Sequence, residues 1–157
     1  MAATDTIDVN WETRYSMALI KRHIRFYRNL NGALTLLPLF AGSAVAANFI
    51  NQSSLASSAF GLVVVLSTLA QFVVKPGEKR VALKAELQRY LAFLEILPTL
   101  DRIQSEAQFW AINKDDSDII EGLQCVALHD TYLEVDGVVP PSAMQLTRWN
   151  RILRAAS

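Results

Sequence analysis

The chain contains a stretch of 46 residues, 29–74, that carries no charged side chain. Basic residues border it on both sides, with Arg25 and Arg28 before it and Lys75 and Lys79 after it. Most of the surface of a water-soluble protein of 157 residues faces water, so charges normally recur every few residues. This stretch therefore constrains the fold more than any other feature, and it is typical of a chain that enters a membrane.

The charge-free stretch is long enough to cross a bilayer twice. A transmembrane helix needs roughly 20 apolar residues, because the hydrocarbon core is about 30 Å thick. Residues 32–50 and 56–74 each have this length, and residues 51–55 between them can form only a short turn. Backbone groups in lipid must be satisfied within their own segment, which favours helices. The sequence therefore predicts an all-α fold, a two-span transmembrane helical hairpin with cytoplasmic helical extensions.

A soluble helical bundle is the alternative to a membrane hairpin. Core helices of soluble proteins are usually shorter, and polar positions interrupt them at helical spacing. The run 62–66 is instead apolar on every side of a helix, which favours the membrane. Short loops rich in Lys and Arg stay in the cytoplasm. Both flanks of the hairpin are basic and its turn is uncharged, so we expect both termini to be cytoplasmic.

Three regions follow from this pattern: a flexible N-terminus at 1–9, a two-transmembrane helical module at 10–111, and a cytoplasmic helical tail at 112–157. A helix is predicted from about Asn10 to Asn29. It either lies in the membrane interface or runs straight into the first span and packs on the helix after the second span. We favour the second interpretation, because a hairpin brings its two flanks side by side.

The helix after the second span is predicted to follow a kink at Pro76-Gly77. Its apolar residues recur at spacings of 4, 3, 4 and 3, which defines a heptad seam: Leu83, Leu87, Tyr90, Leu94 and Leu97. The seam either packs on the N-terminal helix of the same chain or forms a coiled coil between subunits. It is too short to decide between these alternatives.

The tail is predicted to consist of short helices. A turn at Pro98 and Asp101 precedes a helix over about 100–111, and a second helix, capped by Asp116 or Ser117, reaches Leu128. After a break at Gly137 and Pro140-Pro141, a last amphipathic helix begins at Ser142. This helix either lies on the membrane or docks on the cytoplasmic bundle.

The sequence offers no chemistry of the kind enzymes use. His23 and His129 have no partner at a metal-binding or acid–base spacing, and Cys125 is alone. The acidic residues after Lys114 lack the alternating ligand spacing of a calcium loop. Topology explains the basic flanks, so they do not indicate nucleic-acid binding. We therefore expect no enzyme activity, no catalytic or metal-binding residue, no cofactor and no nucleic-acid partner.

The spans carry residues suited to helix association. Small side chains allow close approach of helices in lipid, and they are found at Gly42, Ser43, Ala46, Ala47, Ser57 and Gly61. Two helices cannot enclose a pore, so a conducting path would need several copies of the chain. Its possible lining is polar: Asn48, Ser67, Thr68 and Gln71. The small residues could equally pack the first span on the second within one chain.

The order of these features resembles the SLATT family, the two-transmembrane effector domains of bacterial conflict systems. The resemblance rests on a basic–aromatic segment at 22–28, a two-span hairpin, and a leucine-rich helix that ends at 90–94, and it covers about 11–111. It implies a prokaryotic or phage protein of the inner membrane that oligomerises and, when triggered, permeabilises that membrane. The family has no catalytic residues to carry over.

Three hypotheses follow. The first is an oligomeric inner-membrane protein that acts as a pore-forming or membrane-perturbing effector in antiviral defence or another conflict system. Its partners would be the lipid bilayer, further copies of the chain and a cytoplasmic sensor protein. The second is a non-conducting membrane anchor or scaffold whose cytoplasmic helices bind a partner. The third is a phage holin-like protein.

Overall fold

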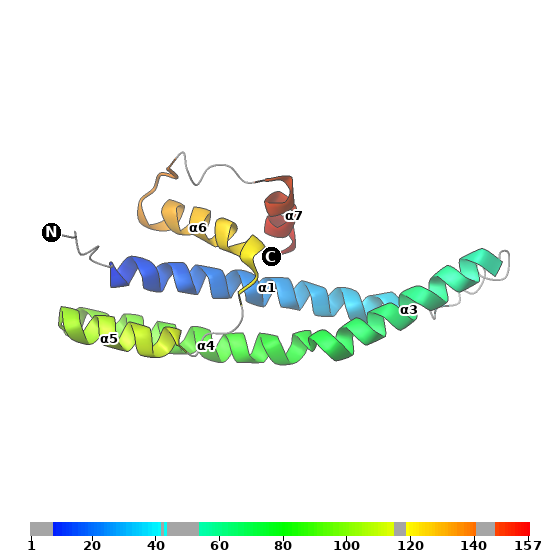
Figure 1. Ribbon diagram of the computed structural model, residues 1–157, viewed down its shortest axis with the longest axis horizontal. Coiled ribbons are helices and arrows are strands. Elements are labelled where there is room, and N and C mark those ends of the chain that lie inside the picture. The colour runs from blue at the N-terminus through cyan, green and yellow to red at the C-terminus, as the bar shows by residue number, and fades with distance from the viewer. Residues whose placement is uncertain (1–7, 42, 44–53, 115–118, 141–146) are drawn as a thin grey trace. The chain divides into compact units, whose positions relative to one another are not determined.

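The computed structural model describes residues 8–41, 43, 54–114, 119–140 and 147–157. Within these ranges all regular secondary structure is helical, which confirms the all-α class (Figure 1). The elements are α1 (Val9–Ala41), α3 (Ser54–Val74), α4 (Pro76–Ile96), the 3₁₀-helix η1 (Leu97–Thr99), α5 (Arg102–Asn113), α6 (Glu121–Val135) and α7 (Arg148–Ala156).

The chain divides into two compact units. We call residues 1–26 and 81–157 the core unit, and residues 27–80 the apolar unit. Both α1 and α4 contribute residues to each unit, because the divisions fall within these two helices.

One described helical run has the length and composition to cross a membrane. It is Ser58–Thr99, and only 6% of its most apolar 18-residue window is buried. A helix in the core of a soluble protein would be mostly buried, so the exposure of this window fits a helix whose surroundings are lipid. The predicted first span is described only as far as Ala41 and at Ser43, and residues 44–50 lie outside the described part. The structure thus supports one candidate span, and the two-span hairpin stays a prediction.

Helix α1 begins where Asp8 caps it. The Asp8 carboxylate accepts hydrogen bonds from the backbone N–H groups of Asn10 and Trp11, at 3.0 and 3.2 Å. From Val9 the helix continues without a break to Ala41. A helix that runs on into the first predicted span is therefore confirmed up to Ala41.

The predicted break between α3 and α4 is confirmed. Helix α3 ends at Val74, and α4 begins at Pro76. Lys75 between them has a φ of 47°, in the left-handed region that non-glycine residues rarely adopt. Proline suits the first position of a helix because its missing N–H would have no partner there.

In the core unit, the first part of α1 lies between α6 on one side and α4 with α5 on the other (Figure 1). On the α6 side, the rings of Trp11 and Tyr132 lie 5.4 Å apart. Apolar residues of three helices form the centre of this packing: Leu19 of α1, Leu123 and Ala127 of α6, and Leu153 of α7. Each is at most 7% exposed, so this cluster holds α6 and α7 against α1.

The tail differs from prediction at the ends of its helices. The turn at Asp101 is confirmed, since its carboxylate accepts from the Gln104 N–H at 2.7 Å and caps α5. The predicted cap of the next helix at Asp116 or Ser117 lies outside the described residues. Residues 119 and 120 are not helical, and α6 begins at Glu121. The predicted end at Leu128 is wrong, because α6 reaches Val135. The additional residues include Tyr132, whose ring packs on Trp11 of α1.

The last helix of the tail follows the predicted break. Gly137 has a φ of 68°, which glycine adopts without steric cost. Helix α7 is capped by Thr147, whose hydroxyl accepts from the Asn150 N–H at 3.2 Å. The predicted start at Ser142 lies outside the described residues.

Candidate functional site: a polar pocket where α3 ends

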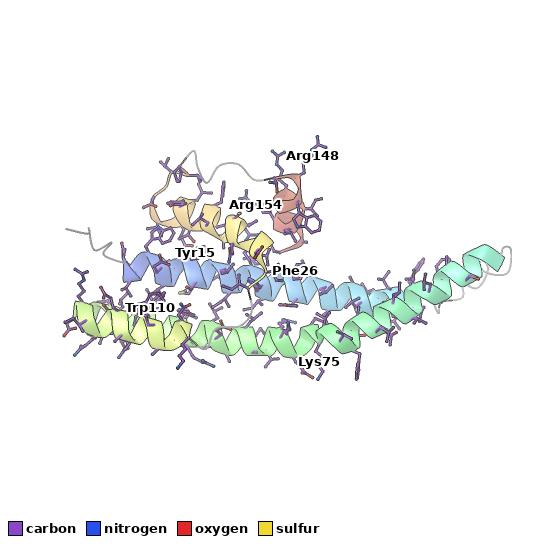
Figure 2. All side chains as sticks on the ribbon, in the orientation of Figure 1. Tyr15, Phe26, Lys75, Trp110, Arg148 and Arg154 are labelled. Carbon is purple, nitrogen blue, oxygen red and sulfur yellow. The ribbon has the colours of Figure 1, made fainter. Side chains whose placement is uncertain are left out.

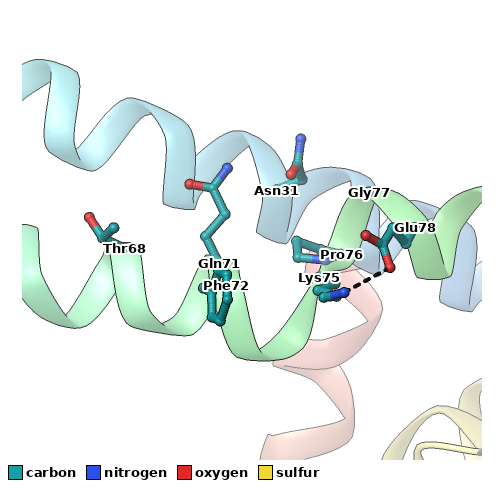
Figure 3. Close-up of a pocket in the computed structure, with 8 residues that line it drawn as sticks. All are labelled: Asn31, Thr68, Gln71, Phe72, Lys75, Pro76, Gly77 and Glu78. Atoms are coloured by element: carbon teal, nitrogen blue, oxygen red, sulfur yellow. Dashed lines mark ion pairs between the residues drawn. The ribbon is translucent and has the colours of Figure 1, made fainter.

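A pocket lies in the apolar unit where α3 ends (Figure 3). Its lining comes from α1, α3 and the start of α4: Asn31, Thr68, Gln71, Phe72, Lys75, Pro76, Gly77 and Glu78. Two of these residues, Thr68 and Gln71, are among the predicted pore-lining residues. Polar side chains are thus gathered at one place beside an otherwise apolar helix.

Thr35 and Gln71 join α1 to α3 beside this pocket. The Thr35 hydroxyl lies 2.8 Å from the Asn31 carbonyl oxygen, to which it donates, because a carbonyl can only accept. Its lone pairs are then free to accept from Gln71, whose Nε2 lies 3.5 Å from Thr35 Oγ1. Figure 3 shows Gln71 extending from α3 toward α1. A short polar row therefore runs from the α1 backbone across to the amide of Gln71.

Two neighbouring hydroxyl groups on α3 differ in their environment. Ser67 and Thr68 both donate to the Val64 carbonyl oxygen, at 3.0 and 2.8 Å. Such bonds let a hydroxyl enter an apolar helix without an unsatisfied donor. Ser67 is only 4% exposed, whereas Thr68 is exposed. Of the two, Thr68 is therefore the residue available to water or to another copy of the chain.

Charged side chains appear only at the edge of the pocket. Lys75 and Glu78 form an ion pair at 3.4 Å, drawn as a dashed line in Figure 3. Lys79 lies over the ring of Tyr27, 5.7 Å from its centroid. Both partners of the Lys75–Glu78 pair are more than half exposed, so it contributes little to stability. The two lysines instead mark the end of the apolar segment, where cations meet lipid headgroups in membrane proteins.

The surface of the apolar unit around this pocket is hydrophobic. Large apolar side chains of α3 are exposed by between 41% and 77%: Leu62, Val63, Val65, Leu66, Leu69, Phe72 and Val73. Those of α1 are exposed to a similar degree: Leu36, Leu37, Leu39 and Phe40. An exposed hydrophobic surface of this kind marks a membrane or protein interaction site.

The predicted helix-association residues are only partly described. Gly42, Ala46, Ala47 and Asn48 lie outside the described residues, and so does the side chain of Ser57. Ser43 is half-buried. Gly61 is described, and a Cβ atom added to it would meet no atom within 4 Å. The close helix approach predicted at Gly61 is thus not made with any described residue, and it stays a prediction.

The seam of α4 lies in the core unit and faces its interior. Its five residues are buried, as at Leu83 and Tyr90, or half-buried, as at Leu87, Leu94 and Leu97. The rings of Tyr90 and Phe109 lie 6.4 Å apart, and the Tyr90 hydroxyl lies 3.5 Å from Asn113 Oδ1. This burial favours packing within one chain. The contacts of Tyr90 are made with α5, whereas the sequence predicted the N-terminal helix as the partner, and a coiled coil between subunits stays a prediction.

Sequence reasoning missed Asn31 and Thr35 in the polar row. Their spacing of four residues inside an apolar stretch was the available signal, because it places both on one face of a helix. It also missed His23 as a structural residue. His23 is only 3% exposed, and its ring nitrogens bond to the backbone of α1 and of the segment before α6. No local pattern marks a contact that spans 97 positions.

The remaining chemistry of the chain is sparse. The described residues contain no group of three or more His, Cys, Asp or Glu side chains that could hold a metal ion. Cys125 is a free and exposed thiol of α6. In comparisons with protein-family models, curated proteins and solved structures, nothing matches this chain significantly. The resemblance to the SLATT family therefore stays an expectation from the sequence.

Proposed function

We propose that this chain is an integral membrane protein that assembles in several copies and opens a permeation path through the bilayer. The observation that carries the proposal is the polar row on an otherwise apolar pair of helices. In this row Thr35 bonds to Gln71, and Thr68 lies exposed one turn before Gln71. The surrounding exposed side chains are large and apolar, which fits contact with lipid.

An amide group in hydrocarbon is energetically costly unless it is hydrogen-bonded. Transfer of an unpaired polar group out of water costs several kcal/mol on alkane scales, roughly 4–8. Within the described part of the chain, the Gln71 side chain bonds to Thr35, and an amide side chain offers two donors and an acceptor. Its remaining groups are satisfied if the row faces water or the same row of another copy. Pairing with another row requires a second chain, and a water-filled path through the bilayer requires several, since two helices enclose no pore.

An effector role follows from this assembly. The basic residues on both sides of the charge-free stretch support an orientation with both termini in the cytoplasm, in a bacterial inner membrane. The core unit would then be available to a cytoplasmic sensor protein that triggers opening. The resemblance to two-transmembrane effectors of conflict systems points to the same role.

The experiment measures membrane potential with a voltage-sensitive dye in bacteria induced to express the intact chain. We expect rapid depolarisation before viability falls, and we expect Gln71→Leu and Thr68→Val to slow it several-fold at equal membrane expression. Ser67→Ala is the matched control, because its hydroxyl is buried and bonded within its own helix. Equal rates for all variants would contradict a path lined by the polar row.

A second candidate function is a non-conducting anchor. It is favoured by the division of the chain into two units, because the core unit is compact by itself. A unit with its own buried cluster of Leu19, Leu123 and Leu153 can bind a partner while the apolar unit only holds it at the membrane. This function predicts a stable membrane potential with the protein confirmed in the membrane fraction. It also predicts that an unrelated hairpin in place of the apolar unit preserves function, whereas a permeation path would be lost.

A further inference from the structure

Helix α7 has two faces with different environments. On one face, Asn150 and Leu153 are buried, and Leu153 belongs to the cluster that holds α7 on α1 and α6. On the other face, Trp149 and Ile152 are 63% and 59% exposed. The sequence left open whether this helix docks on the protein or lies on a membrane. In the structure, α7 packs on the protein through one face, and its other face is exposed.

Polar contacts also fix the docked position of α7. Arg22 of α1 donates through Nη1 to the carbonyl oxygens of Arg154 and Ser157, at 3.4 and 3.1 Å. Arg154 itself lies 3.6 Å from the Asp130 carboxylate of α6. A cation placed at the C-terminal carbonyl groups of a helix stabilises it. The exposed face therefore has a defined orientation relative to the rest of the core unit.

The exposed face is positively charged. Arg148 and Arg151 flank Trp149 and Ile152 in the sequence, and both side chains are exposed. Figure 2 shows Arg148 pointing outward from α7. Among the residues that the structure describes, no acidic side chain forms an ion pair with Arg148 or Arg151, in contrast to Arg154. Two unneutralised guanidinium groups thus border an exposed tryptophan and isoleucine.

We infer that this outer face of α7, formed by Arg148, Trp149, Arg151 and Ile152, binds an anionic lipid surface. Tryptophan settles at headgroup depth, the isoleucine inserts among the upper acyl carbons, and guanidinium groups pair with lipid phosphates. Each cation near an anionic surface adds about 1 kcal/mol to the attraction. Two arginines without an acidic partner, next to an exposed tryptophan, are typical of a helix that lies in a membrane interface.

The membrane location proposed above underlies this inference. A nine-residue helix buries little apolar area, so its affinity for lipid as an isolated segment would be weak. A chain that already holds α3 in the bilayer supplies the second contact, and the helix then meets lipid at high effective concentration. Because α7 is docked through Leu153, lipid contact at Trp149 would couple the core unit to the headgroup composition.

The experiment follows the fluorescence of Trp149 in the full-length chain. Trp11 and Trp110 are replaced by Phe, which leaves Trp149 as the single tryptophan. The purified protein is reconstituted into phosphatidylcholine vesicles, with or without phosphatidylglycerol, that contain lipids brominated near the top of the acyl chains. We expect a blue-shifted emission and strong quenching that increase with phosphatidylglycerol. Arg148→Gln with Arg151→Gln should abolish this increase, whereas the control Arg102→Gln, which removes an arginine paired with Glu106, should retain it.

Two outcomes would overturn the inference. Emission at the water-exposed position, without quenching in either lipid, would show that α7 does not touch the bilayer. If α3 is protected from added protease in the same vesicles, the span is in the bilayer even though α7 does not contact lipid. Failure of this inference can therefore be distinguished from failure of the proposed membrane location. Disulfide-linked dimers of an Ile152→Cys, Cys125→Ser chain, formed in place of quenching, would instead assign this face to a second copy.

Discussion

The ring of His23 in α1 accepts a hydrogen bond from the backbone N–H of Ile120, with 2.9 Å between Nε2 and the amide nitrogen. Its other nitrogen, Nδ1, lies 2.8 Å from the Leu19 carbonyl oxygen. A carbonyl can only accept, so Nδ1 carries the proton and Nε2 offers its lone pair. These two bonds require a neutral imidazole in one tautomer. His23 thus fixes the point at which the chain turns into α6.

Acid should therefore destabilise the core unit. Burial lowers the pKa of His23 below its ordinary value of 6.5, and the neighbouring Glu86 carboxylate and the bond to Leu19 oppose this shift only in part. The unfolded chain then binds more protons than the folded chain below about pH 6.5. Stability contributed by neutral His23 is fully present above this pH and is lost as the pH falls toward the folded-state pKa. Urea unfolding in detergent, followed by tryptophan fluorescence between pH 5 and 8, measures this slope.

His23→Leu tests whether this residue is the source of the slope. The substitution leaves the Ile120 N–H without its acceptor, which should lower the free energy of unfolding by about 1–3 kcal/mol at pH 7.5. It should also flatten the dependence on pH between 5 and 7. A slope that persists in His23→Leu would assign the titration to another group.

Gly122 allows α6 and α7 to approach closely. A Cβ atom at this position would clash with Cδ1 of the buried Leu153. Gly122→Ala should therefore force Leu153 from its rotamer and lower the free energy of unfolding by about 1–3 kcal/mol. Gly77→Ala is the matched control, because a Cβ there meets nothing within 4 Å, and it should be neutral or slightly stabilising. Equal stability of the two variants would contradict the close approach.

The Asp130 carboxylate joins three helices of the core unit. Arg22 Nε donates to its Oδ2 at 2.8 Å, and Arg154 Nη2 lies 3.6 Å from its Oδ1. The Arg22 and Asp130 side chains are 14% and 24% exposed, so water screens their attraction only partly. A double-mutant cycle with Arg22→Ala and Asp130→Ala should give a coupling energy between about 0.5 and 3 kcal/mol.

The more exposed pair of Arg102 and Glu106 provides the comparison for this cycle. It is an i,i+4 pair at 3.0 Å on the surface of α5, and its coupling should be only about 0.3–0.5 kcal/mol. Similar coupling energies for both pairs would show that the contact of Arg22 with Asp130 is solvated in solution.

Local patterns predicted the elements of this fold well. The charge-free stretch predicted α3, and Pro76-Gly77 predicted the break that follows it. Asp101 marked the start of α5 because N-caps depend on residues within one turn. These features were accessible from the sequence because a single segment determines each of them.

Long-range contacts account for what the sequence did not predict. The start of α6 is fixed by His23, which lies 97 residues before Ile120, and Ile120 itself offers no side-chain cap. The sequence predicted that the last helix is amphipathic, but it did not show whether the helix docks on the protein, because an amphipathic helix has the same pattern against lipid and against protein. Of the candidate site, Thr68 and Gln71 were predicted as possible pore-lining residues. Their relation to Asn31 and Thr35 was not predicted, because it depends on how α1 pairs with α3.

The left-handed backbone at Lys75 gives a last prediction. A side chain at a φ of 47° brings its Cβ close to the following carbonyl oxygen, which costs a non-glycine residue roughly 1–2 kcal/mol. Lys75→Gly relieves this strain, whereas Lys75→Ala keeps it, and both variants lose the exposed ion pair with Glu78. The glycine variant should therefore be the more stable of the two by about 1 kcal/mol in urea unfolding, after the larger conformational freedom of glycine in the unfolded chain is subtracted. An alanine variant as stable as the glycine variant would mean that α3 continues into α4 with ordinary helical backbone at this position.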